Sequence, residues 1–311
     1  MATLYVYGRA IELTNLSRVM YPGEDVMTGD VLHYYYRIAD TIMPHIRGRM
    51  LSIRRFPDGV RRPERYETGV PGRVPEWVRT CGVDGREAME ETSQVIVDEP
   101  ATLVYMAQQA CITPYAWLSR ASDPSRPDQI VFDLDPAGPE KRELEDACRA
   151  ARLLREVLAS AGLTAFVMTT GSRGLHVRAP IRPRYGFDET AAFAAEVAER
   201  VASLDPRRLT VRELGHEREG KVLIDHRRNA YGQAVVAPYA LRALPGAPVA
   251  TPLHWDELGA PGRGPRDHTI SSVFTRLASE GDPWGRISSC RGSLPPLGDD
   301  RAREAVSAGS M

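Results

Sequence analysis

The sequence predicts an α+β fold in which mixed and antiparallel sheets are flanked by helices. Between residues 140 and 161, apolar side chains recur at helical spacing, acids occupy the first turn and Gly162 follows the end, which is typical of an amphipathic helix. Residues 130–135 alternate with a period of two instead, as in a strand. Short apolar runs bounded by turn residues lie on both sides of that helix, so strands and helices are interspersed along the chain.

The first third of the chain is expected to form an N-terminal α/β subdomain with a basic segment. Capping residues before an apolar pattern predict helices, and apolar runs beside turn residues predict strands. The expected elements are a helix over 31–43 that Thr28 opens and Pro44 follows, a strand with a turn over 51–66, and a helix over 101–110. Residues 121–128 are rich in loop formers and indicate a surface loop, which we place between a subdomain 1–120 and a catalytic subdomain 121–291.

The catalytic subdomain is expected to continue with a hairpin, a helix and two more strands. These elements are a strand over 163–168 that returns as 175–177, a helix over 188–204, and strands over 221–226 and 234–239. Glycine, serine, proline and charge dominate towards the end, so we expect Gly292 to Met311 to be a disordered tail.

The composition, with 42% hydrophobic and 26% charged residues among 311 positions, is that of a folded enzyme from a cell interior. The N-terminus has no charged-then-apolar signal, and no apolar stretch approaches the ~18 residues that cross a membrane. The four cysteines are too widely spaced to predict a zinc site or a disulfide framework. These features predict a cytoplasmic protein that is not associated with a membrane.

The charge pattern gives an ambiguous indication of nucleic-acid binding. A formal net charge of −1 is not that of a strongly basic DNA-binding module. Arginines nevertheless crowd residues 47–65, whereas acids gather in 84–99 and 140–146. One face could therefore be basic on a neutral protein, although a solvated charged surface explains the same pattern.

Three aspartates end two predicted strands. Asp133 and Asp135 follow the apolar run that begins at Ile130, and Asp225 follows Val222 to Ile224. Alternation along a strand points Asp133 and Asp135 to the same side, about 6–7 Å apart, where two carboxylates can share divalent cations. An isolated Asp-x-Asp before proline and glycine also fits a solvated strand end.

The segment Gly171 to His176, between the two acidic motifs, is suited to phosphate. Ser172 offers a hydroxyl, Arg173 a planar guanidinium and His176 an imidazole, while the glycines allow close approach of the backbone. Acids, phosphate loop and third acid in this order favour a metal-dependent nucleotidyl transferase over a purely structural origin of the motifs.

With these motifs, the chain resembles the polymerase domain of bacterial ligase D, a member of the archaeo-eukaryotic primase superfamily. The motifs are Val-Phe-Asp-Leu-Asp-Pro at 131–136, Thr-Gly-Ser-Arg-Gly-Leu-His at 170–176, Ile-Asp-His at 224–226 and Ala-Pro-Tyr-Ala-Leu-Arg at 237–242. The resemblance extends from about Leu13 to about Asp282 and implies a primase-polymerase fold. Without a recognisable ligase or nuclease domain, the sequence looks like the stand-alone form.

The resemblance implies that a primer 3′-hydroxyl attacks the α-phosphate of a nucleoside triphosphate, commonly a ribonucleotide, with pyrophosphate leaving. It assigns Asp133 and Asp135 to two cations, Mn²⁺ or Mg²⁺, and Asp225 chiefly to the cation that activates the hydroxyl.

The nucleotide-binding residues implied by the resemblance come from three segments. Ser172, Arg173 and His176 match positions that hold the β- and γ-phosphates. Arg242 matches a further arginine on the triphosphate side, and Arg54 matches a lysine near the nucleotide pocket.

The positions expected to contact DNA depart from the family pattern. The residues of this chain expected to face DNA are Arg18, Arg55, Arg61, Arg62, Arg65 and Tyr66. Two lysines that grip a downstream 5′-phosphate correspond to Arg18 and Thr28, and a pair of stacking phenylalanines is reduced to Tyr66. Tyr115 also replaces an expected histidine, and Leu244 an arginine. The catalytic acids match the family, whereas the residues that would contact the DNA end do not. This combination favours a polymerase that fills short gaps in DNA during repair.

Other functions remain compatible with the sequence. The chain could be an end-joining polymerase that acts with Ku and a separate ATP-dependent DNA ligase, or an inactive DNA-binding module. A nuclease would release nucleotide rather than pyrophosphate, and a small-molecule nucleotidyl transferase would need no template. The expected partners are nucleoside triphosphates and gapped or broken double-stranded DNA, bound by a monomer that is associated with the nucleoid.

Overall fold

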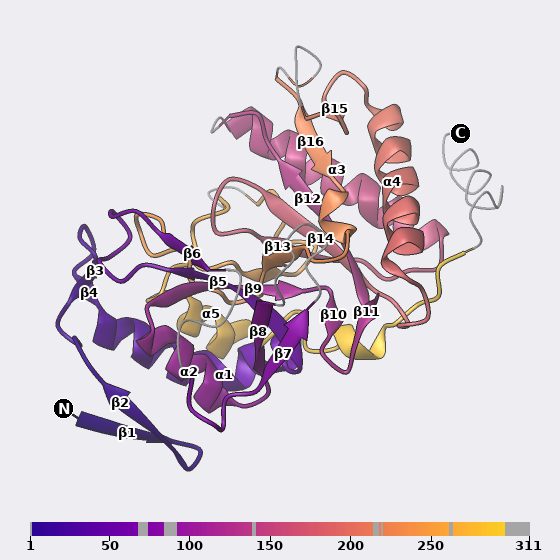
Figure 1. Cartoon of the computed structure of the whole chain (residues 1–311). Helices are drawn as coiled ribbons and strands as arrows, with labels where there is room; N and C mark the ends of the chain where they lie inside the picture. The colour runs from indigo at the N-terminus through magenta and orange to yellow at the C-terminus, as the bar shows by residue number, and fades with distance from the viewer. Residues whose placement is uncertain are drawn as a thin grey trace. The chain divides into compact units, whose positions relative to one another are not determined.

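Residues 2–67, 74–83, 92–138, 141–213, 218, 220–260 and 264–295 are described by the computed structural model, with the backbone alone at 53, 65–67, 83, 92 and 141. The chain folds into two units. Unit 1 is formed by Met1–Ser122, Ala234–Thr251 and His268–Gly281, and unit 2 by Asp123–Gln233, Pro252–Asp267 and Asp282–Met311. The predicted α+β fold is confirmed, because each unit combines helices with an antiparallel or mixed sheet (Figure 1).

Unit 1 is built on an antiparallel sheet with strand order β17-β9-β5-β8-β7, in which β6 also pairs with β5. These strands are β5 (Arg49–Arg55), β6 (Arg65–Glu67), β7 (Thr80–Val83), β8 (Thr92–Val97), β9 (Cys111–Trp117) and β17 (Ala234–Val236). The remaining elements of the unit are β1 (Ala2–Val6), β2 (Arg9–Leu13), β3 (Val19–Tyr21), β4 (Val26–Met27), β10 (Ser119–Arg120), α1 (Thr28–Ile46), α2 (Pro100–Gln108) and α5 (Val273–Glu280).

Buried tyrosines of unit 1 hold a segment that is distant in sequence. The Tyr34 hydroxyl donates to the Tyr239 carbonyl at 2.7 Å, and the Tyr35 hydroxyl accepts from the Leu241 amide at 3.1 Å. Tyr21 donates to the Arg242 carbonyl at 2.9 Å. The strand predicted over 234–239 ends earlier, at Val236. Beyond it, Tyr239 adopts a left-handed φ of 61°, which does not fit a continuing strand.

Helix α1 is longer than predicted, because Pro44 lies inside it rather than beyond its end. A proline in the last turn removes only its own N–H bond, and the Arg47 amide still closes the helix on the Met43 carbonyl at 2.9 Å. In α2, proline occupies the first helical position, where its missing N–H would have no helical partner in any case.

Unit 2 is built on a sheet with strand order β15-β16-β12-β14-β13-β18, antiparallel except for the β15–β16 pair. The strands of this sheet are β12 (Gln129–Asp135), β13 (Phe166–Thr169), β14 (Leu175–Pro180), β15 (Leu209–Thr210), β16 (Val222–Asp225) and β18 (Pro252–Leu253), and unit 2 also contains β11 (Asp123–Pro127) outside it. Its helices are α3 (Lys141–Ser160), α4 (Phe187–Leu204) and the short 3₁₀ turns η2 (Arg227–Asn229) and η3 (Ile287–Ser289).

One face of the unit 2 sheet forms the main core of that unit. Helices α3 and α4 lie side by side against it (Figure 1), and their apolar residues join those of the strands in a single buried cluster. Phe132, Leu134, Val177 and Ile224 are all 0% exposed in this cluster. The opposite face of β12 is thereby left to the residues that alternate with them.

Two segments of unit 2 differ from the sequence-based predictions. Residues 121–128 are not all loop, because β11 covers Asp123–Pro127; its prolines are tolerated in a strand with a free side. The predicted tail also begins too early. The Arg182 amide donates to the Gly292 carbonyl at 2.8 Å, and Leu294 is 9% exposed, so residues 292–295 belong to the fold. The predicted disorder of 296–311 lies outside the described residues.

The predicted boundary near residue 121 lies beside the first passage between the units, after Ser122. The chain then returns twice to unit 1, at Ala234 and at His268. Within the described part of the chain, no helix is both long and apolar enough to cross a membrane.

Asn229 completes the hydrogen bonding of β12 where β16 has ended. Its side-chain oxygen accepts from the Val131 amide at 2.9 Å, and its side-chain nitrogen donates to the Val131 carbonyl at 2.7 Å. The same nitrogen donates to the His226 carbonyl at 2.7 Å. Asn229 is 0% exposed, and its carboxamide takes the place of a backbone peptide group from a neighbouring strand beside β12.

Replacing Asn229 by Leu is therefore expected to destabilise the protein by about 2–4 kcal/mol, because two buried backbone groups lose their partners at about 1–3 kcal/mol each. Urea unfolding of the variant measures the loss. The control is Gln233→Ala, whose side chain accepts from Arg228 at the surface and should change the free energy of unfolding by less than about 0.5 kcal/mol. Equal stability of Asn229→Leu and the wild type would contradict this role.

Candidate active site

Three of the predicted site residues form a row across neighbouring strands of unit 2. Asp133 of β12 pairs with His176 of β14 on one side and with Asp225 of β16 on the other. Residues directly opposite each other on antiparallel strands share a face, with Cα atoms about 4.5–5.5 Å apart. Asp135 lies two residues further along β12 on the same face. The sheet therefore brings all three predicted carboxylates together.

Each carboxylate has a cationic or imidazole neighbour. Asp135 accepts from Arg173 at 3.3 Å through Oδ1 and from Arg218 at 2.7 Å through Oδ2. Oδ1 of Asp133 lies 3.6 Å from Nε2 of His176. These contacts distribute positive charge over the acidic side of β12.

Asp225 is held more tightly, by the residues that follow it. Its Oδ1 accepts from both the backbone amide and Nε of Arg227, each at 2.9 Å, while its Oδ2 lies 3.9 Å from Arg228. Arg227 also donates to Glu213, which lowers the pKa of that carboxyl and raises the pKa of the guanidinium. Burial lowers the pKa of neighbouring His226, which favours its neutral form.

The three carboxylates fit divalent cations in chemical type and in register. Oxygen ligands from adjacent positions on one face are what Mg²⁺ and Mn²⁺ prefer. Among the described residues, however, no group of three or more such side chains converges as a preformed metal site. The arginine contacts account for this, because they draw the carboxylates of Asp135 and Asp225 towards their own guanidinium groups. Both oxygens of Asp135 are engaged by arginines, so cation binding there requires exchange of at least one of them, whereas Asp225 keeps its Oδ2 available beside the Oδ1 that binds Arg227.

The hairpin predicted between the two acidic motifs is confirmed, and its tip lies between Thr169 and Leu175. This tip, which contains Gly171 and Gly174, is called the phosphate-type loop below. Thr170 closes the loop, because its backbone amide and hydroxyl both donate to the Gly174 carbonyl, at 3.0 and 3.1 Å. A Cβ at Gly174 would lie 2.1 Å from the Leu134 carbonyl oxygen, so only glycine allows this approach to the end of β12. Arg266 donates to the Ser172 carbonyl at 2.9 Å and supports the loop from outside.

Arg178 contacts the imidazole of His176 on this face. Arg178 is 2% exposed, follows His176 by two positions on β14 and lies 5.6 Å from the ring centroid of Trp284. Its guanidinium lies 3.4 Å from Nδ1 of His176. A guanidinium only donates hydrogen bonds, so Nδ1 accepts and the proton of a neutral imidazole is on Nε2. Nε2 is the atom directed towards Asp133.

The two other predicted nucleotide-binding residues lie in unit 1, and both are beside one tyrosine. The guanidinium carbon of Arg54 lies 4.9 Å from the ring centroid of Tyr115, and that of Arg242 lies 5.8 Å from it. Arg242 also donates to the Tyr115 hydroxyl at 3.4 Å, and Arg54 pairs with Glu64 at 3.4 Å. Tyr115 thus links two arginines that the sequence assigned separately to the nucleotide.

The predicted DNA-facing residues also belong to unit 1. Arg18 is exposed and donates to the Pro57 carbonyl, whereas Arg55 donates to the Gln109 carbonyl at 2.7 Å. Arg61 and Arg62 are exposed in the turn after β5. Arg65 and Tyr66 lie on β6, but their side chains are outside the described part of the chain.

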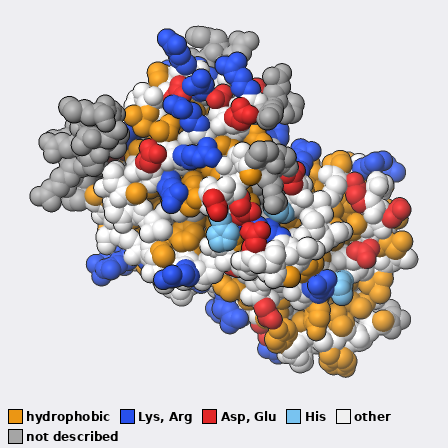
Figure 2. Space-filling model, turned by 180° about the vertical axis from the view of Figure 1, so that it is seen from behind, with side chains coloured by type: hydrophobic (Ala, Val, Ile, Leu, Met, Phe, Trp, Pro, Cys, Tyr) orange, Lys and Arg blue, Asp and Glu red, His pale blue; other side chains and the backbone are white. Residues whose placement is uncertain are grey.

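Two observations argue against one continuous, basic surface that binds phosphates. Thr28 is 6% exposed and directs its hydroxyl to the Arg18 carbonyl at 3.4 Å, so it offers nothing to a phosphate. On the face that Figure 2 displays, arginine and carboxylate side chains are interspersed rather than gathered in one basic patch.

Several site residues were missed by the sequence analysis. Arg178 could have been found by alternation, since it shares a face with His176. Arg227 lies in the turn after Asp225 and carries no periodic signal. Arg218 lies in a charged stretch whose return to Asp135, 83 positions earlier, no local pattern indicates.

Comparison with known proteins identifies the fold and its family. The family model described as LigD, primase-polymerase domain, matches residues 28–284. The chain belongs to this family. Primase-polymerase domains of this kind are nucleotidyltransferases of the DNA polymerase and primase class, and they depend on divalent metals in general.

Relatives of this LigD-type domain are longer proteins. The Mycobacterium tuberculosis (strain H37Rv) protein named multifunctional non-homologous end joining DNA repair protein LigD is 31% identical over 287 residues, which cover 90% of this chain and 37% of that protein. The Bacillus subtilis (strain 168) bifunctional non-homologous end joining protein LigD is 25% identical over 278 residues, covering 88% of this chain and 43% of that protein. The chain thus spans less than half the length of these relatives.

A solved structure is similar over nearly the whole domain. The polymerase domain from Mycobacterium tuberculosis ligase D in complex with DNA matches with a TM-score of 0.83 and 30% sequence identity. The match covers 91% of this chain and 99% of that one.

The contact between Arg178 and His176 predicts the tautomer of His176. In its neutral form, the imidazole should carry its proton on Nε2, as long-range ¹H–¹⁵N NMR correlations report. Arg178→Met should increase the population protonated on Nδ1, while the signals of exposed His254 stay unchanged. Protonation on Nδ1 in the wild type would contradict the role of Arg178.

Proposed function

We propose that this primase-polymerase domain adds nucleotides, preferentially ribonucleotides, to a primer 3′-hydroxyl and fills short gaps in DNA during repair. The observation that carries the proposal is the row His176–Asp133–Asp225 across three strands, with Asp135 beside it and the phosphate-type loop at its end. A nuclease would use similar acids but has less need of a loop suited to a triphosphate. Incorporation with release of pyrophosphate distinguishes the two activities.

In the proposed reaction the primer oxygen bonds to the α-phosphate, and the bond from that phosphate to pyrophosphate breaks. Asp133 and Asp135 would hold both divalent cations, and Asp225 would offer its Oδ2, because Oδ1 is bound to Arg227. Two such cations, Mn²⁺ or Mg²⁺, would lower the pKa of the primer hydroxyl and stabilise the entering and leaving oxygens. Of the arginines around the acids, Arg173 would then become free to bind phosphate oxygens.

The triphosphate would be held by Ser172, Arg173 and His176. Arg173 is half-exposed and paired with Asp135, so an incoming triphosphate would exchange one anionic partner for another. His176 would donate from Nε2, because Nδ1 accepts from Arg178. Arg242 and Arg54 would bind further along the nucleotide, with Tyr115 fixing both guanidinium groups.

DNA would be bound by Arg18, Arg55, Arg61, Arg62, Arg65 and Tyr66 at a gap or a break. End joining together with Ku and a separate ligase is the second candidate function, and the names of the relatives favour it, since each is called a non-homologous end joining protein. The buried hydroxyl of Thr28 supports gap filling instead, because it supplies no charge for a downstream 5′-phosphate.

The decisive experiment is extension of a labelled primer on gapped DNA, with ribonucleotides or deoxyribonucleotides and with Mn²⁺ or Mg²⁺. The proposal requires template-dependent extension with pyrophosphate release, and faster extension with ribonucleotides. Turnover without a template would indicate a small-molecule nucleotidyl transferase. Tight DNA binding without any incorporation would indicate an inactive DNA-binding module.

Asp133→Asn and Asp135→Asn should each lower incorporation on the order of a thousandfold, because a neutral amide cannot replace a carboxylate at a cation. DNA affinity should stay equal or rise slightly in Asp135→Asn, since Arg173 and Arg218 lose their counterion. Primer extension and DNA titration measure both effects, with exposed Asp256→Asn as the control. Extension by the double variant near the wild-type rate would refute the assignment.

A downstream 5′-phosphate should improve affinity for gapped DNA by less than about tenfold, because Arg18 is the one charged residue left of the predicted pair. Titration of gapped duplexes that end in a 5′-phosphate or a 5′-hydroxyl, at two salt concentrations, measures the gain. Thr28→Ser, which keeps the hydroxyl, is the control. A gain of about a hundredfold that Arg18→Ala removes would make end joining the better function.

A further inference from the structure

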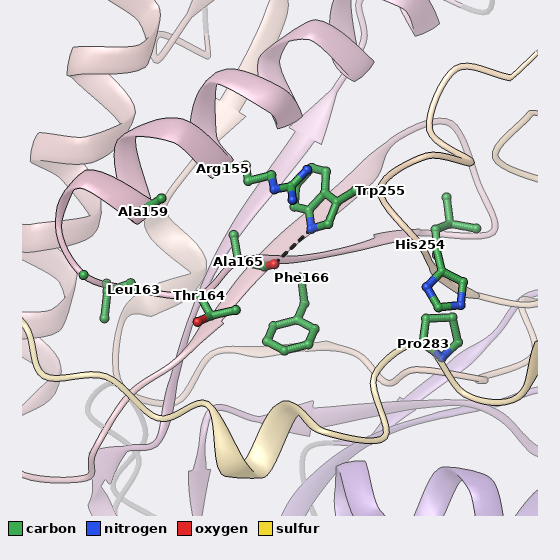
Figure 3. A pocket seen from close by; sticks show the side chains of 11 residues that line it. Arg155, Ala159, Leu163, Thr164, Ala165, Phe166, His254, Trp255 and Pro283 are labelled. Atoms are coloured by element: carbon green, nitrogen blue, oxygen red, sulfur yellow. Dashed lines mark hydrogen bonds between the residues drawn. The ribbon is translucent and has the colours of Figure 1, made fainter. Parts of the chain in front are cut away.

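Unit 2 contains a cavity of about 490 Å³ whose lining residues take no part in the proposed reaction (Figure 3). It opens beside the last turns of α3, the start of β13 and the residues around β18. Its volume falls within the ~300–1,000 Å³ of small-molecule sites. The side chains that shape it are Leu163, Thr164, Phe166, His254, Trp255 and Pro283, with Arg155 at its edge.

Arg155 gives this cavity a positive charge in a fixed position. Its guanidinium carbon lies 4.9 Å from the ring centroid of Trp255, and the indole is held by a hydrogen bond from Nε1 to the Ala165 carbonyl at 3.0 Å. Stacking occupies the flat face of a guanidinium and leaves its N–H edge available. Among the residues that the structure describes, no carboxylate lies within ion-pair distance of Arg155. An anionic ligand group would therefore meet a charge that is not already neutralised.

The other lining groups suit a flat aromatic ligand. Figure 3 shows the Phe166 ring below Arg155 and Trp255, and the His254 imidazole beside the Pro283 ring to the right of them; all of these residues line the cavity. Phe166 and Trp255 are half-buried, so their rings are partly available to a ligand. Every nucleobase has a face that stacks on such rings. An acidic side chain would match the guanidinium alone, whereas a nucleotide matches both the charge and the rings.

The cavity is separate from the acids but lies on the same unit. Strand β13 begins at Phe166 in the cavity and ends at Thr169, directly before the loop at Gly171. At about 3.3 Å per residue, the cavity and the loop are roughly 15–20 Å apart, a distance of a few nucleotides along an extended strand.

We propose that this cavity is a second nucleotide-binding subsite, in which Arg155 binds a phosphate and the rings around Phe166 take up a base. An unpaired nucleotide of a single strand is the occupant that fits a polymerase, so the choice of a strand rests on the proposed function. A free mononucleotide has the same chemistry and is the alternative source of the ligand.

The test is photocrosslinking of a short single-stranded DNA that carries 5-iodouracil, followed by mass-spectrometric mapping. The crosslink is expected in the segments 163–166 or 253–255. Arg155→Gln should weaken strand binding about five- to tenfold and lower the crosslink accordingly. Arg207→Gln is the matched control, because Arg207 is an exposed arginine of the same unit that does not line the cavity. His254→Ala, at a second exposed position, should also reduce the crosslink.

Competition identifies the source of the ligand. If AMP displaces the strand at comparable nucleotide concentration, the subsite accepts free nucleotides; if only a strand competes, it accepts a strand. Absence of a crosslink in both segments, or equal binding by Arg155→Gln and Arg207→Gln, overturns the subsite. Displacement by an acidic peptide but not by AMP or a strand overturns it too. Asp133→Asn should keep the crosslink, so loss of polymerase activity alone would refute the proposed function and leave the subsite standing.

Discussion

The pairing of β12 with strands on both of its edges is the constraint on which the site depends. One face of β12 is packed into the core through Phe132 and Leu134, both 0% exposed. A shift of one residue in register would turn those side chains outwards and force Asp133 and Asp135 into the core, where an unpaired charge costs several kcal/mol. The hydrophobic face therefore fixes the position of the acids, and Asn229 extends the same bonding beyond the end of β16.

The phosphate-type loop depends on the same strand. Gly174 lies against the Leu134 carbonyl with no room for a side chain, so the loop is positioned by the backbone of the strand that carries Asp133 and Asp135. Thr170 fixes the other side of the loop through the Gly174 carbonyl. Distances between acids and loop are thus set by covalent geometry and backbone bonds, which hold a site more precisely than long side chains do.

Local sequence patterns predicted the strands, the hairpin and the acids because each of these is encoded within a few residues. Alternation around Phe132 and the glycines at 171 and 174 are such signals. The return of the chain to unit 1 has no local signal, because it depends on Tyr21, Tyr34 and Tyr35, whose hydroxyls bond residues more than 200 positions away. The roles of Arg218 and Tyr115 were missed for the same reason. Their partners are distant in sequence, and a single arginine or tyrosine in a charged or apolar stretch does not indicate its partner.

The ion pairs around the acids differ in how readily they can be exchanged. The Arg173–Asp135 pair is open to solvent, with 53% and 32% of the two side chains exposed, and such pairs contribute about 0–1 kcal/mol. The Asp225 side chain is 13% exposed and accepts from Arg227 through a backbone and a side-chain donor. Release of Arg227 would therefore leave a more buried charge without a partner. Ligand binding should therefore displace Arg173 first and leave Arg227 in place. A triphosphate that brings its own negative charge to Arg173 would free Oδ1 of Asp135 for a cation, while Oδ2 keeps its contact with Arg218, so nucleotide and metal binding would favour each other at this carboxylate.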